Sequence, residues 1–152
     1  MPLKIFILDD EIHSGGLSNR SNLKDILGRH ELTLATSCPE AIKVYKPGTY
    51  DLLLLDHDME GWIETRKNHP NTGLQFCKWL VQHETIARPP VLIHSHNPDG
   101  KKAMRLLLQD YGFKVEEHYY GRAYERALLD KFGRRCYICD EYNCEACEGT
   151  YV

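Results

Sequence analysis

The chain has 152 residues, with 19 basic and 22 acidic side chains and a formal net charge of −3. This length suits one domain with a single core, and the even spread of charge, without a basic block, disfavours duplex DNA as a partner. No stretch approaches the about 20 consecutive apolar residues that cross a bilayer, and no signal-peptide pattern is visible, so we expect a cytoplasmic protein that does not bind membranes.

The first part of the chain alternates between strand-like and helix-like segments. Four consecutive leucines at 52–55 are typical of a strand that is covered on both faces. In chain order, hydrophobic periodicity predicts a strand over 3–8, a helix over 19–29, a strand over 31–36, a helix over 39–45 and a strand over 51–55.

The same alternation continues after a polar stretch at 58–71, which fits no regular period and is either a lid over a pocket or an irregular segment. Beyond it, the pattern predicts a helix over 72–83, a strand over 91–95, a helix over 100–111, a short strand over 114–117 and a helix over 120–132. Strict alternation favours an α/β fold with a parallel sheet between helices. We expect one domain over residues 1–133 and a cysteine-rich tail over 134–152.

Three polar clusters share one property, because each directly follows an apolar strand. In parallel sheets, ligands bind outside the carboxyl ends of the strands, so these clusters are expected to converge there. Carboxylates and imidazoles at one edge predict a pocket for a metal and a phosphate. The clusters are Asp9-Asp10-Glu11, Asp56-His57-Asp58 and His94-Ser95-His96-Asn97.

Over about residues 3–132 this arrangement resembles a response-regulator receiver domain. The resemblance implies a three-layer, flavodoxin-like fold with a five-stranded parallel sheet of order 2-1-3-4-5. Asp9 and Asp10 match the acidic pair of that family, Asp56 matches its phospho-acceptor and Ser95 its hydroxyl position, which together imply a bound Mg²⁺. One departure is that no lysine directly follows the fifth predicted strand, where the sequence reads VEEHYYG.

Histidines and further polar residues around the expected pocket narrow the resemblance. The motifs LDDE at 8–11, LDHD at 55–58, NTG at 71–73 and HSHNP at 94–98 look like the divergent branch called cyclic-phosphate-processing receiver domains. That likeness implies action on cyclic phosphates, such as the 2′,3′-cyclic ends met in RNA repair. We therefore expect a metal-dependent phosphoesterase that acts on a phosphate-containing small molecule or an RNA end. The alternative is a noncatalytic receiver module that senses phosphate or binds a protein.

Each candidate site residue has an expected role. Mg²⁺ or Mn²⁺ is the expected metal because clustered carboxylates repel one another without a cation, and ligation by His57 or Asp58 would shift preference toward Mn²⁺, Fe²⁺ or Zn²⁺. His94 and His96 lie two apart, so on a strand they share a face opposite Ser95 unless the chain turns near Asn97. The predicted metal ligands are Asp9, Asp10, Asp56 and Asp58; the catalytic residues are His94, His96, Asp56 and His57; the phosphate-binding residues are Ser95, Asn97 and Lys101, although Lys101 also suits a solvated surface position.

The tail carries two Cys-x2-Cys pairs separated by four residues. Four thiolates would complete a tetrahedral Zn²⁺ shell, although the gap is shorter than the about 15 to 20 residues usual between such pairs. A flexible thiol tail, disulfides and an iron–sulfur cluster are the alternatives. The predicted zinc ligands are Cys136, Cys139, Cys144 and Cys147, and a protein partner could bind through this tail.

Overall fold

The computed structural model describes residues 3–10, 30–58, 69–95 and 97–118. The predicted helices over 19–29 and 120–132, most of the polar stretch, His96 and the cysteine tail with its predicted zinc site lie outside the described residues. Within the described part, no helix is long and apolar enough to cross a membrane.

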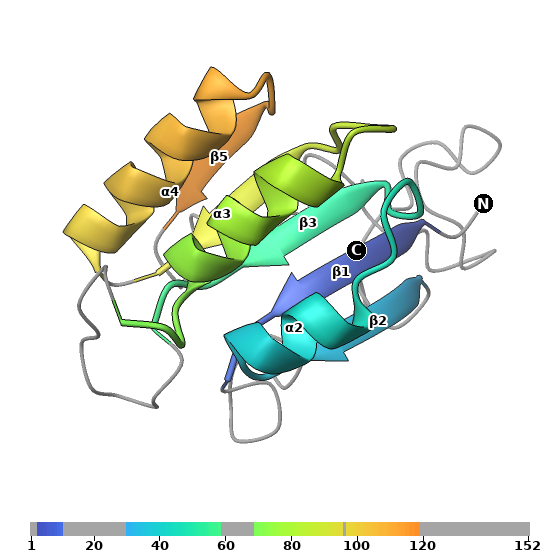
Figure 1. The fold of residues 1–152 in the computed structure, drawn as a ribbon, viewed down its shortest axis with the longest axis horizontal. Helices are drawn as coiled ribbons and strands as arrows, with labels where there is room; N and C mark the ends of the chain where they lie inside the picture. The colour runs from blue at the N-terminus through green and yellow to red at the C-terminus, as the bar shows by residue number, and fades with distance from the viewer. Residues whose placement is uncertain (1–2, 11–29, 59–68, 96, 119–152) are drawn as a thin grey trace, which may run out of the picture.

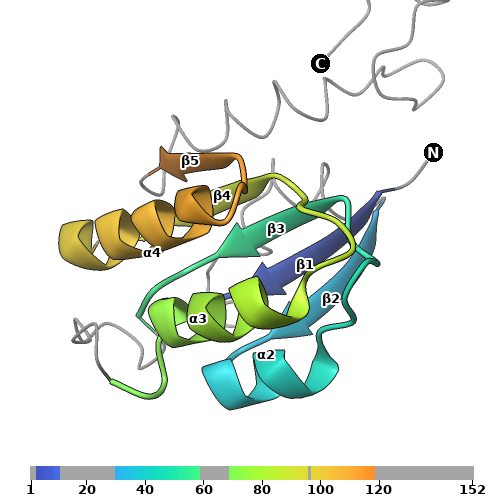
Figure 2. The same ribbon diagram turned by 45° about the horizontal axis from the view of Figure 1, so that its top comes forward.

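Five parallel strands form one sheet in the order β2-β1-β3-β4-β5, which confirms the predicted topology (Figure 1). Three helices, α2, α3 and α4, lie over the same face of this sheet (Figure 2). The strands are β1 (Lys4–Leu8), β2 (Glu31–Ala35), β3 (Leu52–Leu55), β4 (Val91–His94) and β5 (Val115–His118), and the helices are α2 (Cys38–Val44), α3 (Gly73–His83) and α4 (Pro98–Asp110).

The core lies between the sheet and the three helices. Phe6, Leu53 and Ile93 point to this side and pack with helix residues such as Phe76 and Met104, all of them fully buried. Alternate strand residues, including Ile7 and Leu54, are also fully buried on the opposite face. The four leucines of β3 therefore belong to a strand covered on both faces, as their unbroken apolar run predicts.

Each described helix begins at a polar cap, and these caps account for small differences from the predicted bounds. Ser37 caps α2, Thr72 caps α3 and Asn97 caps α4, and each side chain accepts a backbone N–H from the first turn. Helix α4 begins at Pro98, two residues before the predicted start, because proline is accommodated in the first turn of a helix.

Strand β4 ends at His94, one residue before the predicted end, and the chain turns there. The Ser95 hydroxyl accepts the backbone N–H of Asn97 at 3.1 Å, a local bond that competes with continuation of the sheet. The turn brings the first residues of α4 to the carboxyl edge of the sheet.

Candidate functional site

Three side chains from neighbouring strands meet at the carboxyl edge of the sheet. Leu8 of β1 is paired with Leu55 of β3, and Leu55 is paired with Ile93 of β4. The next residues along these strands are Asp9, Asp56 and His94, which therefore occupy one row across the sheet. The backbone N–H of Asp56 still donates to the Leu8 carbonyl at 2.9 Å, so the row is held by the sheet itself.

Because the three residues share a row in a parallel sheet, their side chains point to the same face. Potential ligand atoms of Asp9, Asp56 and His94 lie within 4.8 Å of one another, and all three residues are buried. His94 Nε2 lies 3.3 Å from Asp9 Oδ2, within hydrogen-bond distance. We call Asp9, Asp56 and His94 the acidic row.

The acidic row places two carboxylates close together in a buried position. Burial raises the pKa of Asp56 well above its ordinary value, and the neighbouring carboxylate of Asp9 adds to the shift; the Asp10 and Asp58 carboxylates contribute further. The backbone N–H of His57 donates to Asp56 Oδ1 at 2.7 Å and acts in the opposite direction. A carboxylate whose pKa is raised by burial and by its acidic neighbours fits a site that a cation completes.

The donor set fits a divalent cation. Two carboxylates and one imidazole give a mixed oxygen and nitrogen set, which suits Mn²⁺, Fe²⁺ or Zn²⁺ as well as Mg²⁺. The nitrogen donor in the row is His94, whereas His57 or Asp58 was the expected source of a mixed set. Asp10 and Asp58 lie near enough to raise the pKa of Asp56 but are not members of the row.

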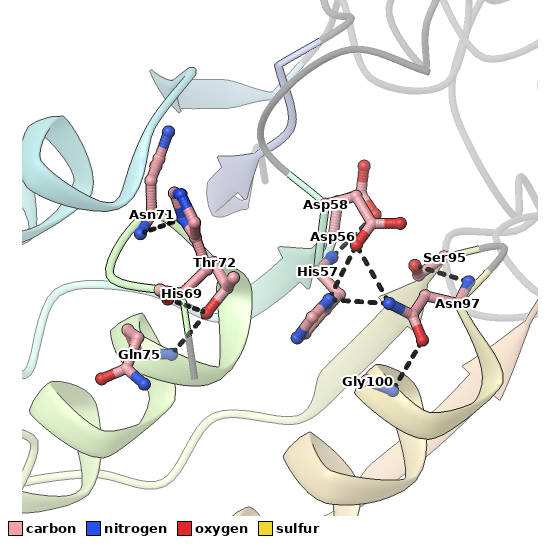
Figure 3. Close-up of polar contacts among 10 residues, drawn as sticks. All are labelled: Asp56, His57, Asp58, His69, Asn71, Thr72, Gln75, Ser95, Asn97 and Gly100. Carbon is pink, nitrogen blue, oxygen red and sulfur yellow. Dashed lines mark hydrogen bonds and ion pairs between the residues drawn. The ribbon is translucent and has the colours of Figure 1, made fainter. Parts of the chain in front are cut away.

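Asp58 belongs to a second polar group at the start of α4. Figure 3 shows its contacts, in which Asp58 Oδ1 lies 2.9 Å from His57 Nδ1 and accepts from Asn97 Nδ2 at 3.1 Å. The Asn97 side chain also accepts the Gly100 N–H at 2.9 Å through Oδ1. A single side-chain amide therefore connects Asp58, which follows β3, with the first turn of α4. We call Asp58, His57 and Asn97 the cap triad.

The cap triad is packed too closely to rearrange freely. The His57 ring is fully buried against Gly100, where a Cβ would collide with the ring. Its Nε2 atom has no hydrogen-bond partner among the described residues. Asn97 is almost entirely buried, with its amide engaged at both ends. These two side chains are therefore held in place beside the acidic row.

A third set of contacts holds the start of α3 against the residues that follow β3. Asp58 pairs with Thr72 in an isolated bridge, and Gly73 N donates to the His57 carbonyl at 2.8 Å. A Cβ at Gly73 would fall on the Asp56 carbonyl oxygen, so only glycine permits this approach. The glycine of the Asn-Thr-Gly motif thus packs directly against the backbone of Asp56, and Figure 3 shows Thr72, the residue before it, at the start of α3.

The remaining predicted phosphate ligands lie around this edge. Ser95 is buried, and its hydroxyl oxygen accepts from the Asn97 N–H. Lys101 is only 4% exposed, on the inward face of α4 with Met104, rather than solvated as a surface lysine would be. The roles predicted for the site residues stay predictions.

A parallel sheet of this strand order with aspartates at the ends of β1 and β3 defines a receiver domain. The chain belongs to the family of cyclic-phosphate processing receiver domains, whose model matches residues 4–110. No curated protein matches the sequence.

Solved receiver domains share the fold. The non-phosphorylated HemR receiver domain from Leptospira biflexa has a TM-score of 0.59 at 18% identity, covering 86% of this chain and 93% of that one. The chemotaxis protein CheY4 of Vibrio cholerae has a TM-score of 0.57 at 18% identity, covering 86% and 96%. A response regulator from Burkholderia pseudomallei, solved with a phosphorylated aspartic acid, calcium ion and citrate, has a TM-score of 0.55 at 15% identity, covering 84% and 65%.

Proposed function

We propose that this chain is a metal-dependent phosphoesterase that hydrolyses a cyclic phosphate, either the 2′,3′-cyclic end of an RNA or a cyclic nucleotide. The observation that carries the proposal is the acidic row, in which a histidine completes a buried pair of aspartates. Membership in the cyclic-phosphate processing family supports the choice of substrate class.

The reaction needs three things from the protein. Negative charge on the phosphate must be neutralised, a water must lose a proton as it attacks phosphorus, and the leaving ribose oxygen must gain one. Water attacks phosphorus, and the bond between phosphorus and one ribose oxygen breaks. That ribose oxygen becomes a free hydroxyl, and the water oxygen becomes part of a phosphate monoester. A divalent cation held by Asp9, Asp56 and His94 would supply charge neutralisation and a more acidic water.

The side chains of the protein would move the protons and help to bind the phosphate. His94 lies within hydrogen-bond distance of Asp9, which orients its ring. In the proposed roles His96, which lies outside the described residues, exchanges a proton with the leaving oxygen. The first turn of α4 lies beside this edge of the sheet, and Lys101 places a positive charge on that turn.

A noncatalytic receiver is the second candidate. Asp56 occupies the phospho-acceptor position and is buried beside Asp9, and the Burkholderia response regulator carries a phosphorylated aspartic acid. The chain lacks a lysine directly after β5, however, and a phosphorylation switch has no evident need for His94 in the row.

Turnover assays separate the two candidates. The protein is incubated with 2′,3′-cyclic AMP, 3′,5′-cyclic AMP and an RNA with a 2′,3′-cyclic end, in Mg²⁺, Mn²⁺ or Zn²⁺. We expect hydrolysis of at least one substrate, loss of it in Asp9→Asn and His94→Gln, and no loss in Asp110→Asn, which changes an exposed aspartate at the end of α4. Absence of turnover, together with labelling of Asp56 by acetyl phosphate, would establish the noncatalytic candidate instead.

A further inference from the structure

A cavity of about 440 Å³ lies at the amino end of the sheet, opposite the acidic row. Its walls come from residues of β1 and β2, the last turn of α2 and the loop that leads to β3. The lining residues are Lys4, Glu31, Thr33, Lys43, Val44, Lys46, Thr49 and Tyr50.

The cavity exists because α2 is short. Its seven residues span about 10 Å, whereas the five-residue strands β1 and β2 beneath it span about 16 Å. Lys4 is paired with Glu31, and both lie on the sheet face that carries α2. The helix therefore leaves the amino ends of these strands uncovered on that face.

Three exposed lysines from two parts of the chain line this space, because Lys4 begins β1 while Lys43 and Lys46 lie at and just past the end of α2. Lys4, Lys43 and Lys46 make no ion pair within the part of the chain that the structure describes, and Lys4 does not reach its strand partner Glu31. Against one lining carboxylate, Glu31, they leave a net charge of +2. A second carboxylate, Asp51, lies outside the lining, where it accepts the backbone N–H of Lys4.

The character of the lining favours a phosphate group. Lysine ammonium groups bind phosphate as point charges, and the hydroxyls of Thr33 and Thr49 can donate to its oxygens. A phosphate monoester carries about two negative charges near neutral pH, which matches the lining. The volume lies within the about 300 to 1,000 Å³ of small-ligand sites, and buried Tyr50 offers an aromatic wall.

We propose that this lysine cavity binds a phosphate monoester of mononucleotide size. The site is separate from the acidic row, since Lys4 begins the strand that Asp9 follows. It requires no metal, and its occupancy does not depend on whether the chain is an enzyme.

The test is equilibrium binding of adenosine 5′-monophosphate by calorimetry in EDTA, so that a metal-dependent site makes no contribution. We expect binding that inorganic phosphate competes away, that weakens as NaCl is raised, and that is at least about tenfold weaker in the double variant Lys43→Glu/Lys46→Glu. Lys78→Glu, which reverses an exposed charge on α3 outside the cavity, is the matched control and should bind as the wild type does.

Lys43 lies in the last turn of α2, where a positive charge stabilises the helix, so the charge-reversed pair could affect folding. The neutral double variant Lys43→Gln/Lys46→Gln is therefore measured as well. Far-ultraviolet circular dichroism checks the fold of each variant. Weaker binding by a folded neutral pair supports the proposal. Equal binding by the wild type and the folded neutral pair overturns it, whatever the charge-reversed pair does. So does equal binding of adenosine, which lacks the phosphate, or no binding of the monophosphate.

Discussion

Replacing Asp56 by asparagine should stabilise the metal-free protein at pH 8. The ligand atoms of Asp9 and Asp56 are at most 4.8 Å apart. Coulomb's law at an effective dielectric constant of about 20 gives at least about 3.5 kcal/mol of repulsion between two full charges at that separation. Asparagine removes this repulsion and keeps an oxygen that can accept the His57 N–H. Because the pKa of Asp56 is raised, this carboxyl is not fully ionised and less than the full repulsion is present, so we expect a gain of about 1–3 kcal/mol.

The gain should depend on pH in a defined direction. The pKa of Asp56 is raised in the folded protein, so its proton is released later there than in the unfolded chain. The contribution of Asp56 to the stability of the wild type is therefore largest at a pH below the pKa of this group in the unfolded chain. That contribution is lost as pH rises through the pKa of the group in the folded protein. The asparagine variant has no such slope, so the difference between the two proteins should shrink as pH falls from 8 to 4.5.

The assay is urea unfolding in EDTA at several pH values, followed by tryptophan fluorescence, and repeated with MnCl2. Manganese should raise the stability of the wild type and raise that of the variant less, since the variant lacks one carboxylate ligand. Asp110→Asn, at an exposed position, controls for the loss of a negative charge. A variant that is less stable than the wild type in EDTA at pH 8, or a difference that does not vary with pH, would refute the reasoning.

Three further predictions concern the supports of the site and the core. Gly73→Ala should destabilise the fold by more than about 1 kcal/mol in urea unfolding, although alanine is normally the better helix residue, because its Cβ meets the Asp56 carbonyl; an unchanged midpoint would contradict the packing. Asn97→Ala should cost about 1–3 kcal/mol, since it removes the cap of α4 and a donor to Asp58, and Asn97→Asp should recover only the cap contribution; full recovery by aspartate would show that the bond to Asp58 contributes nothing. Tyr45→Phe should remove a loss of stability above about pH 10, because burial and a hydrogen-bonded carboxylate raise the pKa of the Tyr45 hydroxyl, so that folding opposes its ionisation as pH rises; equal alkaline unfolding curves for the two proteins would contradict this.

The strands and the parallel sheet were predictable because each strand has a simple sequence pattern, whereas the order of the strands was implied by the resemblance to receiver domains. The unbroken leucines of β3 mark a strand covered on both faces, and the alternation of strands and helices restricts the topology to few choices. The ends of elements were less predictable, because they depend on single hydrogen bonds. The Ser95 hydroxyl ends β4 early, and the Asn97 amide starts α4 at Pro98 instead of Gly100.

The lysine cavity could not be predicted from spacing. Lys4 is far along the sequence from Lys43 and Lys46, and nothing in their neighbours distinguishes them from other exposed lysines. They line one space because a helix of seven residues is shorter than the strands it covers. The difference in length between α2 and the strands beneath it becomes evident only in the three-dimensional structure.

The register of the strands determines which side chains form the acidic row. The sequence places aspartates and histidines at the ends of strands, but it does not say which residue of His94-Ser95-His96 lies level with Asp56. The pairing of Leu55 with Ile93 answers this, because the next row then contains Asp56 and His94. A shift of one residue would put Ser95 in the row and turn the imidazole to the other face. With His94 in the row, the cluster has a nitrogen donor beside two buried carboxylates, and on this basis we infer chemistry beyond that of an aspartate pocket that only accepts a phosphoryl group.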